Sequence, residues 1–363
     1  MKVIFAFDSF KGCMTAEDAC HAAAMAAKET CPDIVTEEIP LSDGGEGLVS
    51  SVKNMLNVDI VTINAHDPLM NLIKASYAIS TDGETAYMEM AETSGLPLVP
   101  VEKRNSLLTT TYGVGDMIAD AVTRGCKHII MGIGGSATSE GGAGMIQSLK
   151  DKELLDKNGK IINDKLSNCT FTVACDVNNP LYGENGAAYI YGPQKGATPE
   201  QVVVLDNRLR EMAHELENCG LAKPDDALTP GAGAAGGLGY GLMVVLHATL
   251  KRGIDIVLDI NRFDERVKDA DLIITGEGKS DLQSLMGKVP VGVLSRSKKY
   301  GIKTIIASGA IEAKEQLIAA GFADVVSINE GDSRPLSELM QTDVAIANLK
   351  KTISNLAKQL FKY

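Results

Sequence analysis

The sequence is poor in aromatic residues and contains no tryptophan. Aromatic side chains make up 4% of its 363 residues, and 47 acidic side chains outnumber 35 basic ones, for a net charge of −12. Proteins that coat nucleic acids need clustered Lys and Arg for the phosphates and aromatic rings for the bases. The composition therefore argues against nucleic acid as a partner.

Disulfide and membrane signals are also missing. The seven cysteines are odd in number and form no CxxC pair, which disfavours a disulfide framework and a zinc site. No apolar run reaches the ~18 residues of a membrane-spanning helix, and the apolar stretch after Met1 is too short for a signal peptide. We therefore predict a cytoplasmic protein with reduced thiols and no membrane partner.

Glycine is the residue in excess, with 36 copies in the chain, against a usual share of ~7%. Glycine-rich turns expose backbone N–H groups, and these bind anions without a charged side chain. An acidic protein can therefore still bind phosphates or carboxylates, provided that such turns converge on one place.

Short apolar runs alternate with helical patterns over most of the chain, as is typical of βα units and a parallel sheet. The strands expected on this basis are residues 3–7, 34–40, 128–132, 170–175, 272–275, 304–308 and 325–328. The expected helices cover residues 16–29, 112–124, 199–218 and 342–361, and others begin near residues 45, 141 and 233. Thr15 and Thr198 are the expected N-caps of two of them.

Residues 58–90 follow another pattern. Apolar and polar residues alternate around residues 60–63, 73–79 and 85–90, and the turn signals Asp67-Pro68 and Asp82-Gly83 separate them. We therefore predict an antiparallel ribbon that interrupts the parallel pattern. The chain is predicted to have an α/β fold of two α/β domains. One is a Rossmann-like parallel-sheet domain built from both chain ends, residues 1–66 and 260–363, and the other is an inserted mixed-sheet domain, residues 67–259.

Three glycine segments imitate nucleotide-binding motifs. Residues 231–236 satisfy GxGxxG but follow no strand, which leaves close helix packing and a phosphate-facing helix start as alternatives. Residues 276–280 resemble the end of a P-loop, yet Ile273 stands where that motif requires glycine. Residues 132–137 follow a strand and precede a helix, where backbone N–H groups can bind an anion.

Five predicted strands end in polar loops, at residues 8–12, 42–47, 134–142, 176–179 and 276–281. In open parallel sheets, ligands bind beyond the carboxyl ends of the strands. Glycine N–H groups and lysines hold phosphates, carboxylates hold Mg²⁺, and an aspartate can accept the proton of a substrate hydroxyl. The loops together favour an enzyme of phosphoryl transfer.

The same loops resemble motifs of the glycerate kinase family, of the bacterial glycerate 2-kinase type. The matching segments are FDSFKG at 7–12, SDGGEG at 42–47, LTTTYGVG at 108–115, GIGGSAT at 132–138, CDVNNPL at 175–181, GPQKGAT at 192–198, GAGAAGGLG at 231–239, and ITGEG at 274–278 with Gly287-Lys288. Each segment alone is weak, but their shared order along most of the chain is specific.

The resemblance implies an ATP-dependent kinase that acts on D-glycerate with Mg²⁺ and yields 2-phosphoglycerate. It also implies two α/β domains with an active-site cleft between them, and it leaves a homo-oligomer open. One position departs from the pattern. Relatives often carry Asn-Asp where this chain has Ser139-Glu140, which puts a metal role for this position in doubt.

Candidate site residues come from these loops. The catalytic candidates are Asp8, Lys11, Asp43, Asp176 and Asp281. The substrate-binding candidates are Ser9, Lys11, Gly44, Gly45, Asn178, Asn179 and Lys195. The candidates for binding ATP are Gly134, Gly135, Ser136, Thr138, Gly276, Gly278, Lys279 and Lys288. The candidate Mg²⁺ ligands are Asp176, Glu277 and Asp281.

Structural roles compete with several of these assignments. Asp43 suits an N-cap, Asp176 suits an Asx turn, and Lys195 suits a flexible loop. Ser136 and Thr138 could cap the following helix without a ligand. The sequence leaves open which aspartate is the general base. Among the five histidines, only His66, beside a turn, is kept as a reserve candidate.

Two other functions compete with a kinase. Residues 132–137 also suit a nicotinamide-dependent hydroxy-acid dehydrogenase, although its ribose-binding acid is expected ~20 residues further on, and Asp176 follows much later. A non-catalytic anion-binding module is the third reading. It would keep the glycine loops but has no use for carboxylates in five of them.

Overall fold

The apolar segment that opens the chain forms an interior strand of a parallel sheet. In the computed structural model, which describes residues 1–10, 12–42 and 47–360, β1 (Lys2–Phe7) pairs with β2 (Val35–Glu38) on one side and with β9 (Leu272–Gly276) on the other. Beyond β9 lie β11 (Lys303–Ser308) and β13 (Asp324–Ser327), which complete a parallel sheet in the order β13-β11-β9-β1-β2. The two chain ends therefore build one sheet.

Contacts divide the chain into two units, which are described separately. Unit 1 comprises residues 1–43 and 254–363, and unit 2 comprises residues 44–253. The predicted boundaries, at 66/67 and 259/260, differ from this division. Residues 47–66 lie in unit 2 because β3 (Val58–His66) pairs along its whole length with β4 (Leu72–Ser80).

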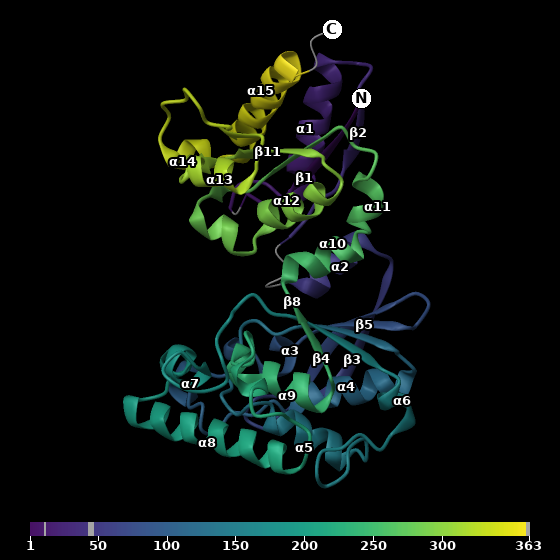
Figure 1. Ribbon diagram of the computed structural model, residues 1–363, viewed down its shortest axis with the longest axis vertical. Coiled ribbons are helices and arrows are strands. Elements are labelled where there is room, and N and C mark those ends of the chain that lie inside the picture. Colours follow the sequence, from purple (N-terminus) through teal and green to yellow (C-terminus); the bar gives the residue numbers. More distant parts are fainter. Residues whose placement is uncertain (11, 43–46, 361–363) are drawn as a thin grey trace. The chain divides into compact units, whose positions relative to one another are not determined.

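Helices cover both faces of the sheet in unit 1. Val3, Phe5 and Phe7 face the Ala-rich helix α1 (Ala16–Thr30) and the closing helix α15 (Thr342–Leu360), which lie side by side (Figure 1). The opposite face packs against α12 (Val289–Lys299). The remaining elements of this unit are β10 (Lys279–Ser280), β12 (Ala310–Ile311), α10 (Gly253–Ile260), α11 (Phe263–Val267), the 3₁₀-helix η6 (Leu282–Met286), α13 (Lys314–Ala320) and α14 (Leu336–Leu339).

Unit 2 contains a six-stranded mixed sheet in the order β3-β4-β5-β6-β7-β8. The predicted ribbon forms its antiparallel part, and β5 (Thr85–Glu89) then pairs in parallel with β6 (His128–Gly132). The sheet continues through β7 (Thr170–Ala174) to the short edge strand β8 (Thr249–Lys251), which the sequence did not predict. The α/β class, with one parallel and one mixed sheet, is thereby confirmed.

The helices of unit 2 surround a core that includes one face of its sheet. They are α2 (Leu48–Met55), α3 (Ala91–Ser94), α4 (Tyr112–Arg124), α5 (Ala143–Asp151), α6 (Asp164–Ser167), α7 (Ala187–Tyr191), α8 (Pro199–Asn218) and α9 (Leu238–Val245). The 3₁₀-helices are η1 (Leu96–Leu98), η2 (Val101–Lys103), η3 (Pro193–Lys195), η4 (Asp226–Leu228) and η5 (Ala234–Gly237).

Local signals set several helix boundaries. Thr15 accepts a hydrogen bond from the Asp18 N–H at 3.0 Å and caps α1, as predicted. Thr198 and Gln201 form the reciprocal capping box of α8, which begins and ends where the sequence indicated. Such caps satisfy N–H groups that have no partner within the helix.

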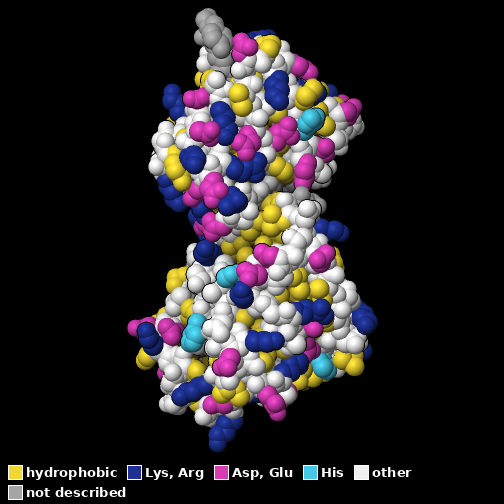
Figure 2. Space-filling model, turned by 90° about the vertical axis from the view of Figure 1, so that its right-hand side faces the viewer, with side chains coloured by type: hydrophobic (Ala, Val, Ile, Leu, Met, Phe, Trp, Pro, Cys, Tyr) yellow, Lys and Arg dark blue, Asp and Glu magenta, His cyan; other side chains and the backbone are white. Residues whose placement is uncertain are grey.

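Surface charge and thiols agree with the composition. Acidic and basic side chains alternate over the visible face of each unit (Figure 2). All seven cysteines fall within the described ranges, and none is in a disulfide. Among the described helices, none combines the length and apolar character needed to cross a membrane.

Candidate active site

The five polar loops belong to two different sheets, so the fold gathers them into two clusters. The loops after β1 and β9 lie in unit 1, the loops after β6 and β7 lie in unit 2, and most of the loop after β2 falls outside the described residues. Lys11, Asp43, Gly44 and Gly45 fall outside the described residues, and their predicted roles stay predictions. Each cluster lines a cavity of its own unit.

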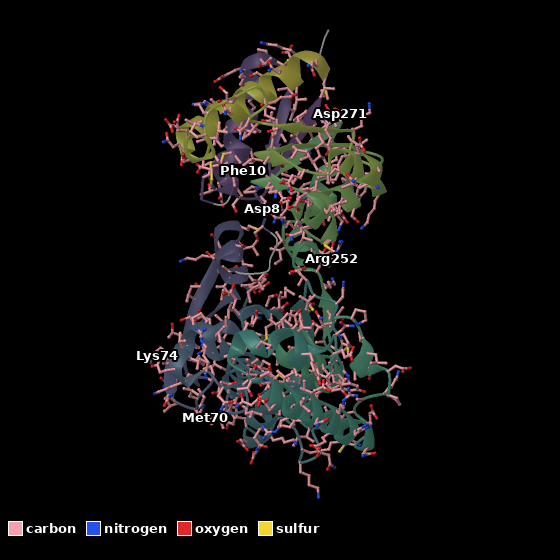
Figure 3. The ribbon with its side chains drawn as sticks, turned by 90° about the vertical axis from the view of Figure 1, so that its left-hand side faces the viewer. Asp8, Phe10, Met70, Lys74, Arg252 and Asp271 are labelled. Carbon is pink, nitrogen blue, oxygen red and sulfur yellow. The ribbon has the colours of Figure 1, made fainter. Side chains whose placement is uncertain are left out.

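The cavity of unit 1 has a volume of about 370 Å³. Asp8 and Ser9 line it from the end of β1, and Glu277, Gly278 and Lys279 line it from the loop after β9. The side chain of Asp8 is buried, and its Oδ1 accepts a hydrogen bond from the Ser9 N–H at 2.6 Å. Asp8 and Phe10 are labelled near the end of β1 in Figure 3.

Glu277 is the buried carboxylate of this cavity. Its Oε1 accepts a hydrogen bond from Ser284 at 2.5 Å, and its Oε2 lies 3.5 Å from the ammonium of Lys288. Burial raises the pKa of Glu277, although Ser284 and Lys288 act in the opposite direction. The unit therefore holds an acid and a cation in direct contact beyond the carboxyl end of β9. The predicted roles of Glu277 as a Mg²⁺ ligand and of Lys288 in ATP binding stay predictions.

Two candidates of the same loop have other partners. Asp281 accepts a hydrogen bond from the Gln283 N–H at 2.8 Å and caps η6. Lys279 forms an ion pair with Glu312 at 2.9 Å, which raises the pKa of Lys279. Asp281 therefore has a structural role and does not line the cavity. Lys279 does line the cavity, and half of its side chain is exposed.

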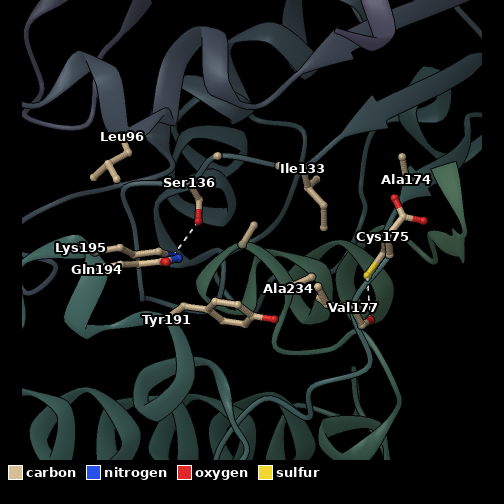
Figure 4. Close-up of a pocket in the computed structure, with 14 residues that line it drawn as sticks. Leu96, Ile133, Ser136, Ala174, Cys175, Val177, Tyr191, Gln194, Lys195 and Ala234 are labelled. Atoms are coloured by element: carbon tan, nitrogen blue, oxygen red, sulfur yellow. Dashed lines mark hydrogen bonds between the residues drawn. The ribbon is translucent and has the colours of Figure 1, made fainter. Parts of the chain in front are cut away.

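The cavity of unit 2 has a volume of about 350 Å³ and contains a buried lysine. Lys195, on η3, is only 3% exposed, and its ammonium donates a hydrogen bond to Ser136 Oγ at 2.6 Å (Figure 4). It donates a second hydrogen bond to the Thr138 carbonyl, also at 2.6 Å. Both acceptors are uncharged, and no carboxylate in the described part of the chain forms an ion pair with this ammonium. Burial lowers the pKa of Lys195 to about 7. A buried cation without a counter-charge favours an anionic ligand.

The loop after β6 forms one wall of this cavity. Gly134, Gly135 and Ser136 all line it, and Gly135 has a positive φ of 73°. Thr138 does not line the cavity but contributes its carbonyl to Lys195. Neither Ser136 nor Thr138 caps the next helix, because α5 begins at Ala143 with Gly142 as its N-cap.

The loop after β7 supplies one carboxylate. Asp176 lines the cavity, and its Oδ1 accepts a hydrogen bond from the Gly253 N–H at 2.9 Å. Asn179 holds the loop together, because its side chain donates to the Asn185 carbonyl at 2.8 Å and accepts from the Tyr191 hydroxyl at 2.6 Å. Asn178 is exposed and is absent from the cavity wall. Of the three, Asp176 has the best position for chemistry.

The residue that departs from the family pattern ties two helices together. Glu140 Oε1 accepts hydrogen bonds from the Thr111 N–H at 2.7 Å, the Thr111 hydroxyl at 2.6 Å and the Gly144 N–H at 2.9 Å. These donors lie at the beginnings of α4 and α5. The glutamate is therefore engaged with protein donors, and its longer side chain has a structural use.

The GxGxxG segment packs closely against neighbouring backbone. A Cβ atom on Gly233 would collide with the Pro180 carbonyl, and a Cβ on Gly236 would collide with the Thr138 carbonyl. Gly236 also has a positive φ of 68°. Of the two alternatives that the sequence left open, these contacts favour close packing.

His66, the reserve candidate, belongs to a separate network. Its ring Nδ1 is hydrogen-bonded to Asp116 Oδ2 at 2.8 Å, and the same carboxylate accepts bonds from Ser148 and Lys152. Asp116 is buried, and the hydrogen bonds from Lys152 and His66 lower its pKa although burial acts in the opposite direction. The network joins β3, α4 and α5, and none of these residues lines the two cavities.

The predicted Mg²⁺ ligands are divided between the units. Glu277 and Asp281 lie in unit 1 and Asp176 in unit 2. In the described part of the chain, no group of three His, Cys, Asp or Glu side chains is arranged to hold a metal ion. Mg²⁺ in kinases is bound through one or two carboxylates together with the phosphates of the substrate. Asp8 and Glu277, which share the cavity of unit 1, fit that requirement.

Sequence reasoning missed the apolar wall of the unit 1 cavity. Leu336, Leu339 and Met340 line it from the segment that follows β13, together with Phe10 and Ile328. This segment has no helical or strand periodicity and carries no charged motif. Its one visible signal was a pair of leucines and a methionine in a polar surface stretch, at residues 329–341.

Comparisons with known proteins agree with the motifs. The family model described as "Glycerate kinase family" matches residues 3–361. The chain is 41% identical to a glycerate kinase of Haemophilus influenzae over the whole of both chains. It is 43% identical to a glycerate 2-kinase of Escherichia coli, with 86% of each chain covered. A crystal structure described as glycerate kinase 2 of Salmonella typhimurium superimposes with a TM-score of 0.82 at 38% identity, covering 99% of this chain and 98% of the other.

Proposed function

The chain belongs to the glycerate kinase family, and from this premise we propose that it transfers the γ-phosphoryl group of ATP to the 2-hydroxyl of D-glycerate, giving 2-phosphoglycerate and ADP. It is an enzyme, a kinase, and the dehydrogenase and the non-catalytic anion-binding module find no support in the comparisons. The observation that carries the proposal is the buried ammonium of Lys195, which faces a cavity large enough for a small organic acid.

Glycerate binding is assigned to unit 2. Its carboxylate would accept a hydrogen bond from Lys195 and from the hydroxyl of Ser136, and the exposed backbone of Gly134 and Gly135 lines the same cavity. A charge-assisted hydrogen bond to a buried ammonium is stronger than one to a neutral donor. The anion would also supply a negative charge, which no carboxylate among the described hydrogen-bond partners of Lys195 provides.

The general base is one of the strand-end aspartates. Asp176 is the first choice among the described candidates because it lines the same cavity as Lys195. In phosphoryl transfer an aspartate orients the attacking hydroxyl and accepts its proton. Asp281 is a weaker choice because its carboxylate already caps η6.

Phosphate binding is assigned to the cations of unit 1. Lys279 and Lys288 line its cavity, and Asp8 and Glu277 are the residues that would hold Mg²⁺ there. The metal would neutralise charge on the transferred group. Release of the 3.5 Å contact between Lys288 and Glu277 would free both side chains for the phosphates and the metal. Asp43 and Lys11 keep their predicted roles as part of this proposal.

The decisive experiment is incubation with ATP, Mg²⁺ and D-glycerate, with the position of the new phosphate read by phosphorus NMR. We expect 2-phosphoglycerate, and no turnover when a chelator removes the metal. Phosphate on the 3-hydroxyl would overturn the regiochemistry. ATP consumption that is indifferent to glycerate would overturn the function itself.

The assignment of the base is tested by substitution. Asp176→Asn should lower kcat by about 10²–10⁴-fold, the usual contribution of general acid–base catalysis, with ADP binding unchanged. Asp281→Asn is the matched control, because it removes a carboxylate at another strand end and should lower kcat much less. Near-normal kcat in Asp176→Asn would reject this choice and leave Asp8 and Asp43 to be tested in the same way.

A further inference from the structure

We propose that the cavity of unit 1 binds the adenosine part of ATP, with the base against the apolar wall that Leu336, Leu339, Met340 and Ile328 form. This inference rests on the proposed function, since it names the place of the nucleoside within the kinase reaction. Its evidence is the distribution of apolar and charged residues along one edge of the parallel sheet.

The carboxyl ends of four neighbouring strands supply both apolar and charged residues to the cavity lining. The sheet runs β13-β11-β9-β1-β2, and the cavity receives residues from the carboxyl ends of the first four. Ile328 follows β13, Gly309 follows β11, Glu277 follows β9, and Asp8 follows β1. Leu336, Leu339 and Met340 follow β13 along the chain, and Phe10 adds an apolar side chain from the loop after β1. The acids and lysines come from the loops after β1 and β9.

The apolar wall is incompletely covered. Leu336 is 67% exposed and Met340 is 41% exposed, yet both line the cavity. Exposed apolar side chains that gather at a cavity mark a binding surface more often than isolated ones do. A planar, largely apolar ring would remove both side chains from water, as aromatic ligands do in clefts of this size.

The charged side fits the remaining part of a nucleotide. Lys279 and Lys288 supply cations, and Asp8 and Glu277 supply oxygen ligands for a metal that accompanies phosphates. One cavity thus offers an apolar surface and a cationic surface, as a molecule with a heterocyclic base at one end and phosphates at the other requires. Glycerate has no apolar face and would leave Leu336 and Met340 exposed.

The cavity of unit 2 is the competing place for the base. It also contains apolar side chains, among them Leu96 and Ile133. Its distinguishing group, however, is the buried ammonium of Lys195 between Ser136 and the Thr138 carbonyl. A buried, uncompensated cation is suited to a compact anion and not to an uncharged nucleoside.

Kinetics provide the first test. Leu336→Asp places a charge on the apolar wall at a position exposed enough for the fold to tolerate it, and KM for ATP should rise about tenfold or more. KM for glycerate should stay unchanged. Ile318→Asp is the matched control, because Ile318 is 40% exposed on α13 of the same unit and lies outside the cavity wall. It should leave both constants unchanged.

Two results would overturn the inference. One is an unchanged KM for ATP in Leu336→Asp. The other is a rise of KM for ATP in Leu96→Asp, in the cavity of unit 2, with Leu336→Asp unaffected. Inhibition by inorganic tripolyphosphate should be the same in wild type and Leu336→Asp, because tripolyphosphate has no base. If Leu336→Asp also weakened tripolyphosphate inhibition, the rise of KM for ATP would come from weaker phosphate binding, and this too would contradict the inference.

A binding measurement separates this inference from the proposed function. The chain has nine tyrosines but no tryptophan, so Leu336→Trp introduces a single tryptophan on the apolar wall, whose emission is distinct from that of tyrosine. Adenosine should quench its emission by stacking, while emission of Leu228→Trp, an exposed position in unit 2, should not respond. Quenching without glycerate turnover would reject the function and keep the adenosine site. Normal turnover without quenching would reject the adenosine site and keep the function.

Discussion

At the scale of single residues, Lys195 is a lysine in an unusual environment, because its side chain is only 3% exposed. Its ammonium is buried and donates hydrogen bonds to the Ser136 hydroxyl and to the Thr138 carbonyl. From the sequence, a flexible loop was as good a prediction for this residue as a binding role, because GPQKGAT contains two glycines and a proline. Burial depends on contacts between η3 and the distant loop after β6, which no local pattern encodes.

The pKa of Lys195 predicts a pH dependence of substrate binding. Since burial lowers this pKa to about 7, the residue is an ammonium below pH 7 and mostly an amine above it. An anion binds the ammonium, so KM for glycerate should rise by up to about tenfold per pH unit above pH 7. Initial rates between pH 6 and 9 measure this, and KM for ATP should not follow the same curve.

The other titratable groups of the cavity do not mimic this profile. Burial raises the pKa values of Cys175 and Tyr191 above their ordinary values of 9.0 and 10.0, so neither group titrates near pH 7. The carboxylate of Asp176 is the remaining charge of the wall, and Asp176→Asn should therefore keep the pH profile of KM. A flat profile in the wild type would show that Lys195 does not change its charge on binding.

The same lysine predicts a pH dependence of stability. Its folded pKa lies below the value of 10.5 for an exposed lysine, so the unfolded chain binds more protons between pH 7 and pH 10.5. The free energy of unfolding should therefore rise with pH through this window. Urea denaturation of wild type and Lys195→Met measures the difference, and the rise should be smaller in the variant.

Glu140 is a second single residue for which the sequence and the structure can be compared, because the sequence put a metal role at this position in doubt. The doubt about a metal role came from the length of its side chain, and the structure gives it three donors near the starts of α4 and α5. Glu140→Ala should lower the free energy of unfolding by ~2 kcal/mol, because it leaves buried donors without an acceptor. Chemical denaturation measures this. A changed Mg²⁺ requirement with unchanged stability would contradict the structural role.

At the scale of elements, the sequence was most accurate where caps and periodicity agree. Residues 112–124 and 199–218 were predicted as helices and form α4 and α8 with the same limits. It failed at β8 and α14, because elements of three or four residues are too short to show a period. The latter failure also hid the apolar wall of the unit 1 cavity.

The glycine segment before α9 yields a prediction at this scale. Gly236→Ala should prevent normal folding of unit 2. The alanine Cβ would overlap the Thr138 carbonyl, and the backbone at this position has a positive φ that alanine disfavours. Gly220→Ala is the matched control, since Gly220 also has a positive φ but no neighbour within 4 Å. It should cost only ~1 kcal/mol. Thermal unfolding of both variants compares the two costs, and equal losses would disprove the packing role.

At the scale of the whole molecule, the alternation of strands and helices indicated the α/β class and a parallel sheet that uses both chain ends. The domain limits were harder to predict, because the sequence pattern of an antiparallel ribbon does not show which of the two domains it belongs to. Pairing of β3 with β4 decides that question, and pairing is a long-range property. Likewise, the described loops after β1 and β9 line one cavity and those after β6 and β7 line another, a grouping by sheet membership that no local sequence pattern shows.

Two cavities in two units predict separate footprints for the two ligands. ADP alone should slow amide hydrogen exchange in unit 1, at residues 276–288 and 328–345. Glycerate alone should slow exchange in unit 2, at residues 133–137 and 192–196. A ligand stabilises the part of the structure that it binds. Mass spectrometry of the exchanged protein measures both, and protection of the same segments by both ligands would contradict the assignment.

The interior position of β1 constrains how the protein is made on the ribosome. Its partner β9 is synthesised only after about 260 further residues, which at ~5–20 residues per second takes roughly 15 to 50 seconds. During this interval the apolar strand Lys2–Phe7 has β2 as its one available sheet neighbour, while all the residues of unit 2 emerge in an unbroken stretch. Unit 2 can therefore complete its fold during translation, and unit 1 must wait for the end of the chain, with its first strand exposed to chaperones until then.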